Sequence, residues 1–150
     1  MKGVSSTDKY YELWVLLADT KEAILKSRQR ELIRHNITAT QAAILFIIQT
    51  IGDQATPSEI SRQIFRKPST ITEILNRMEK QGLVKKVKDL NRKNLVRVVL
   101  TDKGREAYHL SSQRKSIRKI MSSLSSENRQ QLKSFLQTLR EEALKYLKTK

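Results

Sequence analysis

Apolar residues recur at helical spacing along most of this chain, and two short runs near its middle have the composition of strands. Residues 8–35 place their apolar side chains on one stripe, at intervals of three and four residues. Residues 39–51 are apolar on almost every side, which is typical of a helix buried at the centre of a domain. The pattern therefore predicts a long first helix and a central, buried second helix.

Two helix starts are indicated by their capping residues. Thr38 precedes the second helix and is followed three residues later by Gln41, the spacing of a capping box, and Gly52 is placed to end that helix. Residues 56–59 read Thr-Pro-Ser-Glu, in which the threonine caps a third helix, proline takes its first position and the glutamate completes a second capping box. With a turn at residues 65–67, these elements have the order of a helix-turn-helix.

The fourth helix, which begins at Pro68 after the turn, is amphipathic. Its apolar face is formed at the i, i+3, i+4 and i+7 positions by Ile71, Ile74, Leu75 and Met78. The opposite face and its flanks carry hydroxyl, amide and charged groups on Ser69, Thr70, Thr72, Glu73, Asn76, Arg77 and Lys80. These chemical types contact base edges and phosphates in DNA, so these residues are candidate DNA contacts. The alternative is a polar face that is merely solvated.

Gly82 ends the fourth helix, and a β-hairpin is expected after it. Residues 83–87 and 95–100 are rich in valine and are separated by a polar, basic loop over residues 88–94. Beside a helix-turn-helix, such a hairpin is a wing. The candidate DNA contacts at its tip are Asn91, Arg92 and Lys93. The alternative is a solvated hairpin whose charges oppose aggregation.

A helix capped by Thr101 follows the hairpin, and a further helix closes the chain. Apolar residues repeat as in a heptad seam at Ala107, Leu110, Ile117, Met121 and Leu124. Residues 125–127 interrupt the pattern, and the last helix repeats it at Leu132, Leu136, Leu139, Ala143 and Tyr146. Two such seams predict helix–helix packing, within one subunit or between two. Together with the long first helix, they favour a dimer interface built from both ends of the chain.

The balance of charge indicates a polyanionic partner. The 150 residues include 30 Lys and Arg against 15 Asp and Glu, a net charge of +15 with a pI of about 10.3. Such an excess favours DNA, RNA or an anionic membrane surface, and the alternative is a merely soluble basic protein. The sequence contains neither an apolar run long enough to span a bilayer nor a signal-peptide pattern. We therefore expect a cytoplasmic protein without a membrane partner.

Nothing in the sequence suggests an enzyme. The chain has no cysteine, no glycine-rich phosphate loop and no nucleophile motif. His35 and His109 are isolated, so neither a metal nor a cofactor is expected. Trp14 is expected in the core, with the lining of a ligand pocket as the alternative. The few aromatic residues do not cluster on a strand face, which argues against a base-stacking RNA-binding platform.

The order of these elements resembles the multiple-antibiotic-resistance regulator (MarR) family of transcription factors. The resemblance rests on the run M-E-K-Q-G-L-V-K-K from Met78, on the wing that starts at Asp89, and on V-V-L-T-D-K-G ending at Gly104. It extends over nearly the full length. It implies a single domain over residues 1–150, a winged helix-turn-helix over 38–104, and dimerisation helices over 8–35 and 105–148.

By this resemblance the protein is a homodimeric, sequence-specific regulator, usually a repressor, that binds a pseudo-palindromic double-stranded DNA operator. The resemblance also implies release of the DNA by a small effector, which in the family is frequently aromatic or phenolic. It implies that the helix from Pro68 enters the major groove and that the wing reaches the adjacent minor groove. Two positions depart from the family pattern. The usual wing arginine and its acidic neighbour are Asn91 and Arg92 here, which assigns minor-groove insertion to Arg92, and the turn at residues 65–67 lacks the usual glycine. A non-specific architectural or RNA-binding protein is the alternative function.

Overall fold

A computed structural model of the chain describes residues 8–92 and 95–149, which divide into two compact units at the Arg114–Lys115 bond. The fold is mostly helical with one antiparallel hairpin, so the predicted fold class is confirmed. The first unit contains α1 (Lys9–Leu32), η1 (Ile33–His35), α2 (Ala39–Ile51), η2 (Gly52–Gln54), α3 (Pro57–Gln63), α4 (Pro68–Lys80), β1 (Val84–Asp89), η3 (Leu90–Arg92), β2 (Leu95–Leu100) and α5 (Asp102–Ser111). The second contains α6 (Lys115–Met121) and α7 (Ser126–Lys148).

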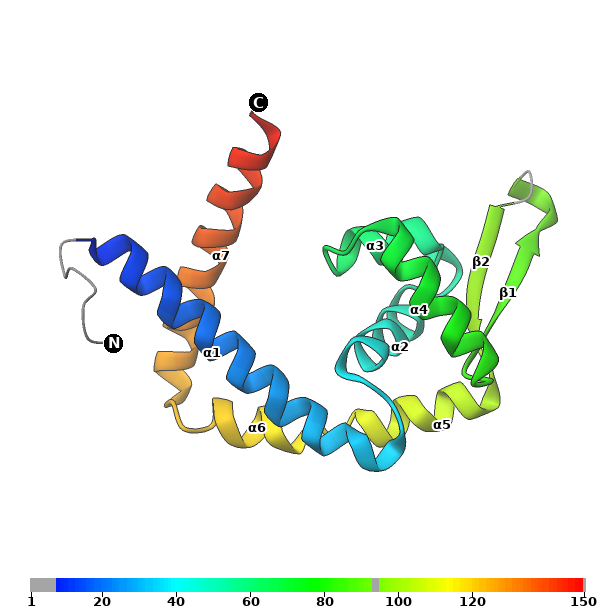
Figure 1. The fold of residues 1–150 in the computed structure, drawn as a ribbon, viewed down its shortest axis with the longest axis horizontal. Helices are drawn as coiled ribbons and strands as arrows, with labels where there is room; N and C mark the ends of the chain where they lie inside the picture. Colours follow the sequence, from blue (N-terminus) through cyan, green and yellow to red (C-terminus); the bar gives the residue numbers. More distant parts are fainter. Residues whose placement is uncertain (1–7, 93–94, 150) are drawn as a thin grey trace. The chain divides into compact units, whose positions relative to one another are not determined.

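The core of the first unit forms around α2, which packs against α1, α3, α5 and β2 (Figure 1). Its fully buried side chains include Leu32, Ile44, Leu45, Ile60, Ile71, Leu75, Met78, Val84 and Val98. The central position of α2 was predicted, but burial on every side was not correct. Phe46 is exposed, and its ring stacks with the guanidinium of Arg114 at 5.2 Å from the ring centroid.

The two predicted capping boxes have different outcomes. At Thr38 the box is complete, since the Thr38 hydroxyl accepts from the Gln41 amide and the Gln41 side chain accepts from the Thr38 amide. At Thr56 the hydroxyl caps α3, but the Glu59 carboxylate accepts from Arg62 and Gln63 instead of the Thr56 amide. The prediction that Glu59 completes the capping box at Thr56 was therefore wrong. A charge-assisted bond to arginine is stronger than one to a neutral amide.

The Glu59–Arg62 pair predicts a pH dependence. The hydrogen bonds from Arg62 and then Gln63 lower the pKa of the Glu59 carboxyl from 4.5 to about 2. Since the folded pKa is the lower one, the pair stabilises the fold above pH 4.5, and this contribution is lost as pH falls from 4.5 toward about 2. Glu59→Gln should therefore flatten the decline of stability across that window. The effect should be small because the Arg62 side chain is well exposed.

The measurement is urea unfolding followed by circular dichroism at a series of pH values between 4.5 and about 2. Glu22→Gln is the matched control. Glu22 is an exposed α1 glutamate that has no ion pair among the described residues, so its loss should leave the shape of the curve unchanged. Equal slopes for the wild type and Glu59→Gln would contradict the assignment.

Both helices of the helix-turn-helix end in a left-handed residue. After α4, Gly82 has φ +77°, and the amides of Gly82 and Leu83 donate to the carbonyls of Glu79 and Met78 at 3.0 and 2.9 Å. This is a Schellman cap, and the predicted stop at Gly82 is confirmed. After α3 the same position is occupied by Phe65, with φ +53°. A left-handed conformation costs a residue with a Cβ about 1–2 kcal/mol.

The hairpin is longer than predicted. β1 pairs with β2 from Val84 opposite Leu100 to Asp89 opposite Leu95, so two residues assigned to the loop belong to the strand. The pairing continues because the 3₁₀ turn of η3 reverses the chain directly after Asp89. The middle of β2 is held by the Val98 amide, which donates to the Ala55 carbonyl at 2.7 Å. This bond joins β2 to the segment between α2 and α3.

α5 begins against the turn that follows α4. The Thr101 hydroxyl caps α5 by accepting from the Gly104 amide at 3.0 Å, and the Thr101 amide donates to the Leu83 carbonyl at 3.1 Å. Gly104 lies so close that a Cβ placed on it would be 2.0 Å from the Leu83 oxygen. The glycine is therefore required by proximity and not by its backbone angles.

The continuous seam predicted over residues 107–124 is wrong, because the helix breaks in its middle. α5 ends at Ser111, and Arg114 adopts φ +51° before α6 begins. The hydroxyls of Ser111 and Ser112 donate to the carbonyls of Tyr108 and His109, which competes with continued helix formation. Arg28 of α1, which is 9% exposed, donates to the Ser111 carbonyl at 2.8 Å and so satisfies the end of α5.

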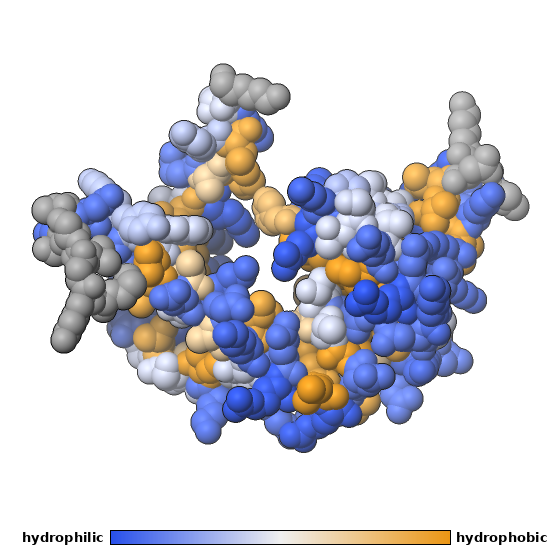
Figure 2. Space-filling model, viewed as in Figure 1, coloured by the Kyte–Doolittle hydropathy of each residue, from blue (hydrophilic) through white to orange (hydrophobic). Residues whose placement is uncertain are grey.

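The first and last helices each carry exposed apolar side chains (Figure 2). On α1 they include Tyr10, Tyr11, Leu13, Trp14 and Leu16, and on α7 they include Phe135, Leu136, Leu139, Tyr146 and Leu147. The expectation that Trp14 lies in the core is wrong for the single chain, since its side chain is 58% exposed. Within residues 8–92 and 95–149, no helix is long and apolar enough to cross a membrane.

Candidate nucleic-acid interface

The packing of α4 determines which of its side chains face outward. Ile71, Leu75 and Met78 are fully buried against the core, as the sequence predicted. The predicted contact residues on the other side are exposed at Ser69, Thr72, Glu73, Asn76, Arg77 and Lys80, whereas Thr70 is half-buried. The structure thus brings these residues together on one helix, with Thr70 at the edge of the exposed face.

Some of these polar groups already have partners within the chain. The Thr72 hydroxyl donates to the Pro68 carbonyl at 2.9 Å, and the Asn76 side-chain oxygen accepts from the ammonium of Lys86. In the part of the chain that the structure describes, the side chains of Arg77 and Lys80 form neither a hydrogen bond nor an ion pair. Arg77 and Lys80 therefore offer unpaired positive charge in the last turns of α4.

Lys86 connects α4 to the hairpin, a role that the sequence did not indicate. Besides its bond to Asn76, its ammonium lies 3.9 Å from a Glu79 carboxylate oxygen, and its backbone amide donates to Glu79 at 3.3 Å. These contacts hold β1 against the exposed edge of α4. The sequence shows only that the first strand contains a lysine. Which residues this lysine contacts depends on how the hairpin folds back against α4.

An ion-pair cluster centred on Asp89 braces the wing. Its carboxylate accepts from the Asn91 amide at 3.0 Å and lies 3.7 Å from the Nε atoms of both Arg92 and Arg97. Arg97 also donates through Nη1 to Asp53 of η2 at 2.7 Å, which ties the wing to the end of α2. Sequence reasoning missed Arg97, because its two acidic partners come from distant parts of the chain.

The predicted residues at the wing tip are described only in part. Asn91 and Arg92 are exposed on η3, whereas Lys93 lies outside the described residues. The Arg92 side chain also borders a hollow of about 550 Å³ whose other lining residues are Ile51, Gln54, Thr56, Glu59 and Leu95. Arg92 therefore stands between Asp89 on one side and the start of α3 on the other.

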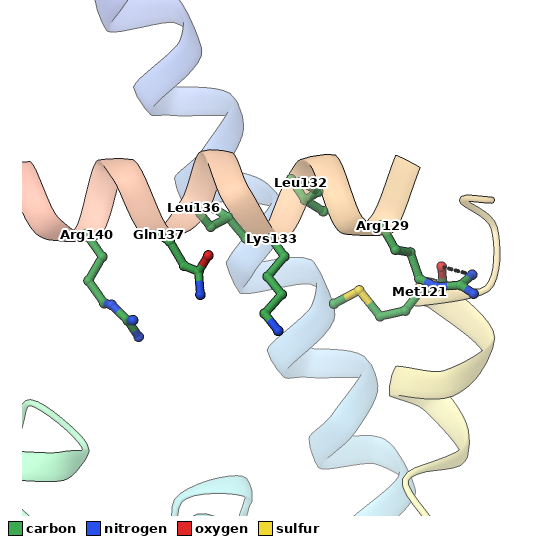
Figure 3. A pocket seen from close by; sticks show the side chains of 7 residues that line it. All are labelled: Met121, Arg129, Leu132, Lys133, Leu136, Gln137 and Arg140. Carbon is green, nitrogen blue, oxygen red and sulfur yellow. Dashed lines mark hydrogen bonds between the residues drawn. The ribbon is translucent and has the colours of Figure 1, made fainter. Parts of the chain in front are cut away.

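A separate cavity of about 400 Å³ lies in the second unit (Figure 3). It is lined by Met121, Arg129, Leu132, Lys133, Leu136, Gln137 and Arg140. Arg129 is engaged there, since it donates to the Leu124 carbonyl at 2.5 Å. Apolar walls with basic side chains suit a small aromatic or anionic molecule. No group of three or more His, Cys, Asp or Glu side chains that could hold a metal ion occurs among the described residues.

This chain is similar to several proteins that are named as transcriptional regulators. Residues 37–94 match the model of the MarR family. The uncharacterised HTH-type transcriptional regulator YsmB of Bacillus subtilis (strain 168) is 35% identical over 83 residues, which are 55% of this chain and 56% of YsmB. The chain thus spans little more than half of that relative. The homoprotocatechuate degradative operon repressor of Escherichia coli is 28% identical over 127 residues, 83% of this chain and 85% of the repressor.

Solved structures share the fold over more of the chain. The ligand-free organohalide-sensing regulator RdhR-CbdbA1625 has a TM-score of 0.84 and 29% identity, and the match covers 96% of this chain and 88% of that one. The same regulator has also been solved in a 2,4-dichlorophenol-bound form. A mutant MarR from E. coli complexed with operator DNA has a TM-score of 0.80 and 20% identity, over 91% of this chain and 99% of that one. At that identity the likeness concerns the fold alone.

Proposed function

This chain belongs to the MarR family of transcriptional regulators through residues 37–94, and we propose that it binds a specific DNA operator as a homodimer and represses transcription. The observation that carries the proposal is the exposed polar face of α4, on which Arg77 and Lys80 have no partner among the described residues, beside a wing braced by Asp89. A helix presents its side chains to base edges in the major groove, while cations on its flanks contact phosphates. The wing, with Arg92 and Lys93, would reach the adjacent minor groove.

The homodimer is proposed from the exposed apolar faces of α1 and α7. Each carries several large apolar side chains that nothing within its own unit covers, and contiguous exposure of this kind marks interaction surfaces. A dimer presents two α4 helices to DNA, which favours a pseudo-palindromic operator with half-sites about one helical turn apart. The dimerisation helices over residues 8–35 and 105–148 remain part of this proposal.

A small-molecule effector is the third part of the proposal. The cavity on α7 has apolar walls and the basic side chains of Lys133 and Arg140, and a related regulator has been solved with 2,4-dichlorophenol bound. An aromatic molecule seated there would act by favouring a dimer geometry with a different half-site spacing. The relatives are named as regulators and not as enzymes, which supports a non-enzymatic role.

Selection of bound duplexes from a random pool, followed by footprinting, tests the proposal. It should recover a symmetric site with two protected half-sites. Binding to that site should exceed binding to a scrambled duplex by about 10³-fold or more and should weaken steeply with salt. The net charge of +15 favours non-specific binding as the second candidate function. Equal affinity for the selected and scrambled duplexes at every salt concentration would establish it instead.

Arg77→Ala and Arg92→Ala should each weaken binding without unfolding the protein. If Arg77 contacts a base edge, its loss should cost about 1–3 kcal/mol and relax specificity at one position of the operator. Loss of Arg92 should reduce the affinity for the operator and should weaken the footprint over the flanking minor groove. The measurement is fluorescence anisotropy with the selected duplex and with variants at each position. Unchanged isotherms for both substitutions would remove the two residues from the interface.

Arg30→Ala is the matched control for these two variants. Arg30 is an exposed arginine near the end of α1, so its replacement removes the same charge and side chain away from α4 and the wing. Arg30 lies within the proposed dimerisation helix, so analytical ultracentrifugation first verifies that the variant has the oligomeric state of the wild type. It should then alter the affinity only through net charge, equally for the selected and the scrambled duplex.

A further inference from the structure

The turn between α3 and α4 places an aromatic residue where glycine is normally required. The Arg66 amide donates to the Ser61 carbonyl at 3.2 Å, and the Ser61 hydroxyl donates to the Arg66 carbonyl at 2.5 Å. The first of these is the longer of the two backbone bonds of a Schellman cap, and Phe65 is the left-handed residue that it encloses, with φ +53°. Gly82 occupies the equivalent position after α4. The chain therefore uses glycine in one cap and phenylalanine in the other.

The other non-glycine residues with positive φ have a local explanation, and Phe65 has none. Asn36 tolerates the left-handed conformation because its side chain is short and polar. Arg114 stacks its guanidinium on the Phe46 ring. The Phe65 side chain is 68% exposed and stacks on no ring or guanidinium group among the described residues. Neither the backbone nor the packing of this unit accounts for an aromatic side chain here, and such outliers cluster at functional sites.

Phe65 lies three residues before the N-terminal end of α4. Under the proposed function, this end of the helix enters a DNA groove. Lys67 is the N-cap of α4, and its side chain makes no capping hydrogen bond. Arg66, Lys67 and Ser69 are all exposed, so Phe65 directly precedes two basic side chains and the first outward residue of the helix. Cations at this point position a helix on phosphates. An aromatic ring among them suits the apolar groups of DNA, which are the thymine methyl and the deoxyribose.

We propose that Phe65 is a DNA-contacting residue that places its ring on an apolar group of the operator at the N-terminal end of α4. Phe65 adds an apolar contact to the polar ones of the helix face and so contributes to specificity. The assignment rests on the proposed function, because it needs α4 to lie in a groove. It gives a reason for a phenylalanine in a left-handed conformation at an exposed turn.

The test separates stability from DNA binding with two replacements that suit a left-handed backbone, Phe65→Gly and Phe65→Asn. Both relieve the strain of the turn, so the thermal midpoint should be unchanged or raised. Affinity for the selected operator should nevertheless fall about tenfold. Asn36→Gly is the matched control, because it makes the same kind of backbone change at φ +57° away from α4. It should leave DNA affinity unchanged.

Replacing single operator thymines by deoxyuridine identifies the apolar group. If the ring contacts a methyl, one such replacement should weaken binding of the wild type and have no effect on Phe65→Gly. If the ring contacts deoxyribose, no replacement should distinguish the two proteins, although Phe65→Gly still binds more weakly.

Suppose that the wild type discriminates between the operator and a scrambled duplex and that both Phe65 variants bind the operator as tightly as the wild type. This result would overturn the assignment of Phe65 and leave the proposed function standing. A wild type that does not discriminate would overturn both. The two failures are therefore distinguishable from the wild-type isotherms alone.

Discussion

Gly104→Ala is expected to lower the free energy of unfolding by about 3 kcal/mol, the upper range for overpacking a well-packed site. An alanine Cβ would be 2.0 Å from the Leu83 oxygen, 3.0 Å from the Leu83 carbonyl carbon and 3.5 Å from the Leu100 Cβ. The Leu83 carbonyl cannot move freely, because it accepts the hydrogen bond from the Thr101 amide. The substitution therefore forces apart α5 and the turn that orients α4 and the wing.

The sign of the change in the free energy of unfolding distinguishes the close approach to Leu83 from local helix propensity. Alanine is favoured over glycine inside a helix by about 1 kcal/mol, so local propensity alone predicts that Gly104→Ala stabilises the chain. Urea unfolding followed by circular dichroism measures the difference. Glu106→Ala, at an exposed position of the same helix, should stay within about 0.5 kcal/mol of the wild type. A midpoint for Gly104→Ala at or above that of the wild type would show that α5 approaches the turn less closely than described.

Leu139→Asp is expected to convert the proposed dimer into a monomer and to reduce operator affinity by about 100-fold or more. Leu139 is exposed on the apolar face of α7, and burying an unpaired carboxylate in an interface is strongly unfavourable. A monomer contacts one half-site, so it loses the gain that comes from joining two binding modules. Analytical ultracentrifugation measures the oligomeric state, and anisotropy with full and half operators measures the affinity.

Gln130→Asp is the matched control for Leu139→Asp. It introduces the same charge into α7 on the face opposite the apolar stripe, near the start of the helix where an acidic residue is tolerated. It should remain dimeric with nearly unchanged operator binding. If Leu139→Asp also remained dimeric at micromolar concentration, the dimer interface would have to be sought away from the middle of α7.

The sequence by itself determined the elements whose signals are local. Thr38 with Gln41, Gly82 and Thr101 mark ends of helices because a cap involves residues within one turn of each other. The orientation of α4 followed from Ile71 and its neighbours, since helical periodicity alone decides which side chains share a face. The order of these elements was sufficient to indicate a winged helix-turn-helix and its outward residues.

Only the tertiary structure decided the contacts that join distant parts of the chain. Lys86 meets Asn76 across two elements, Arg97 meets Asp53 44 residues away, and these choices depend on how the hairpin folds back. The break at Ser111 was equally hidden, because the heptad spacing of apolar residues continues through it while the Arg28 guanidinium satisfies the end of the helix. Local pattern specifies the elements, and long-range geometry specifies which polar groups remain available for a partner.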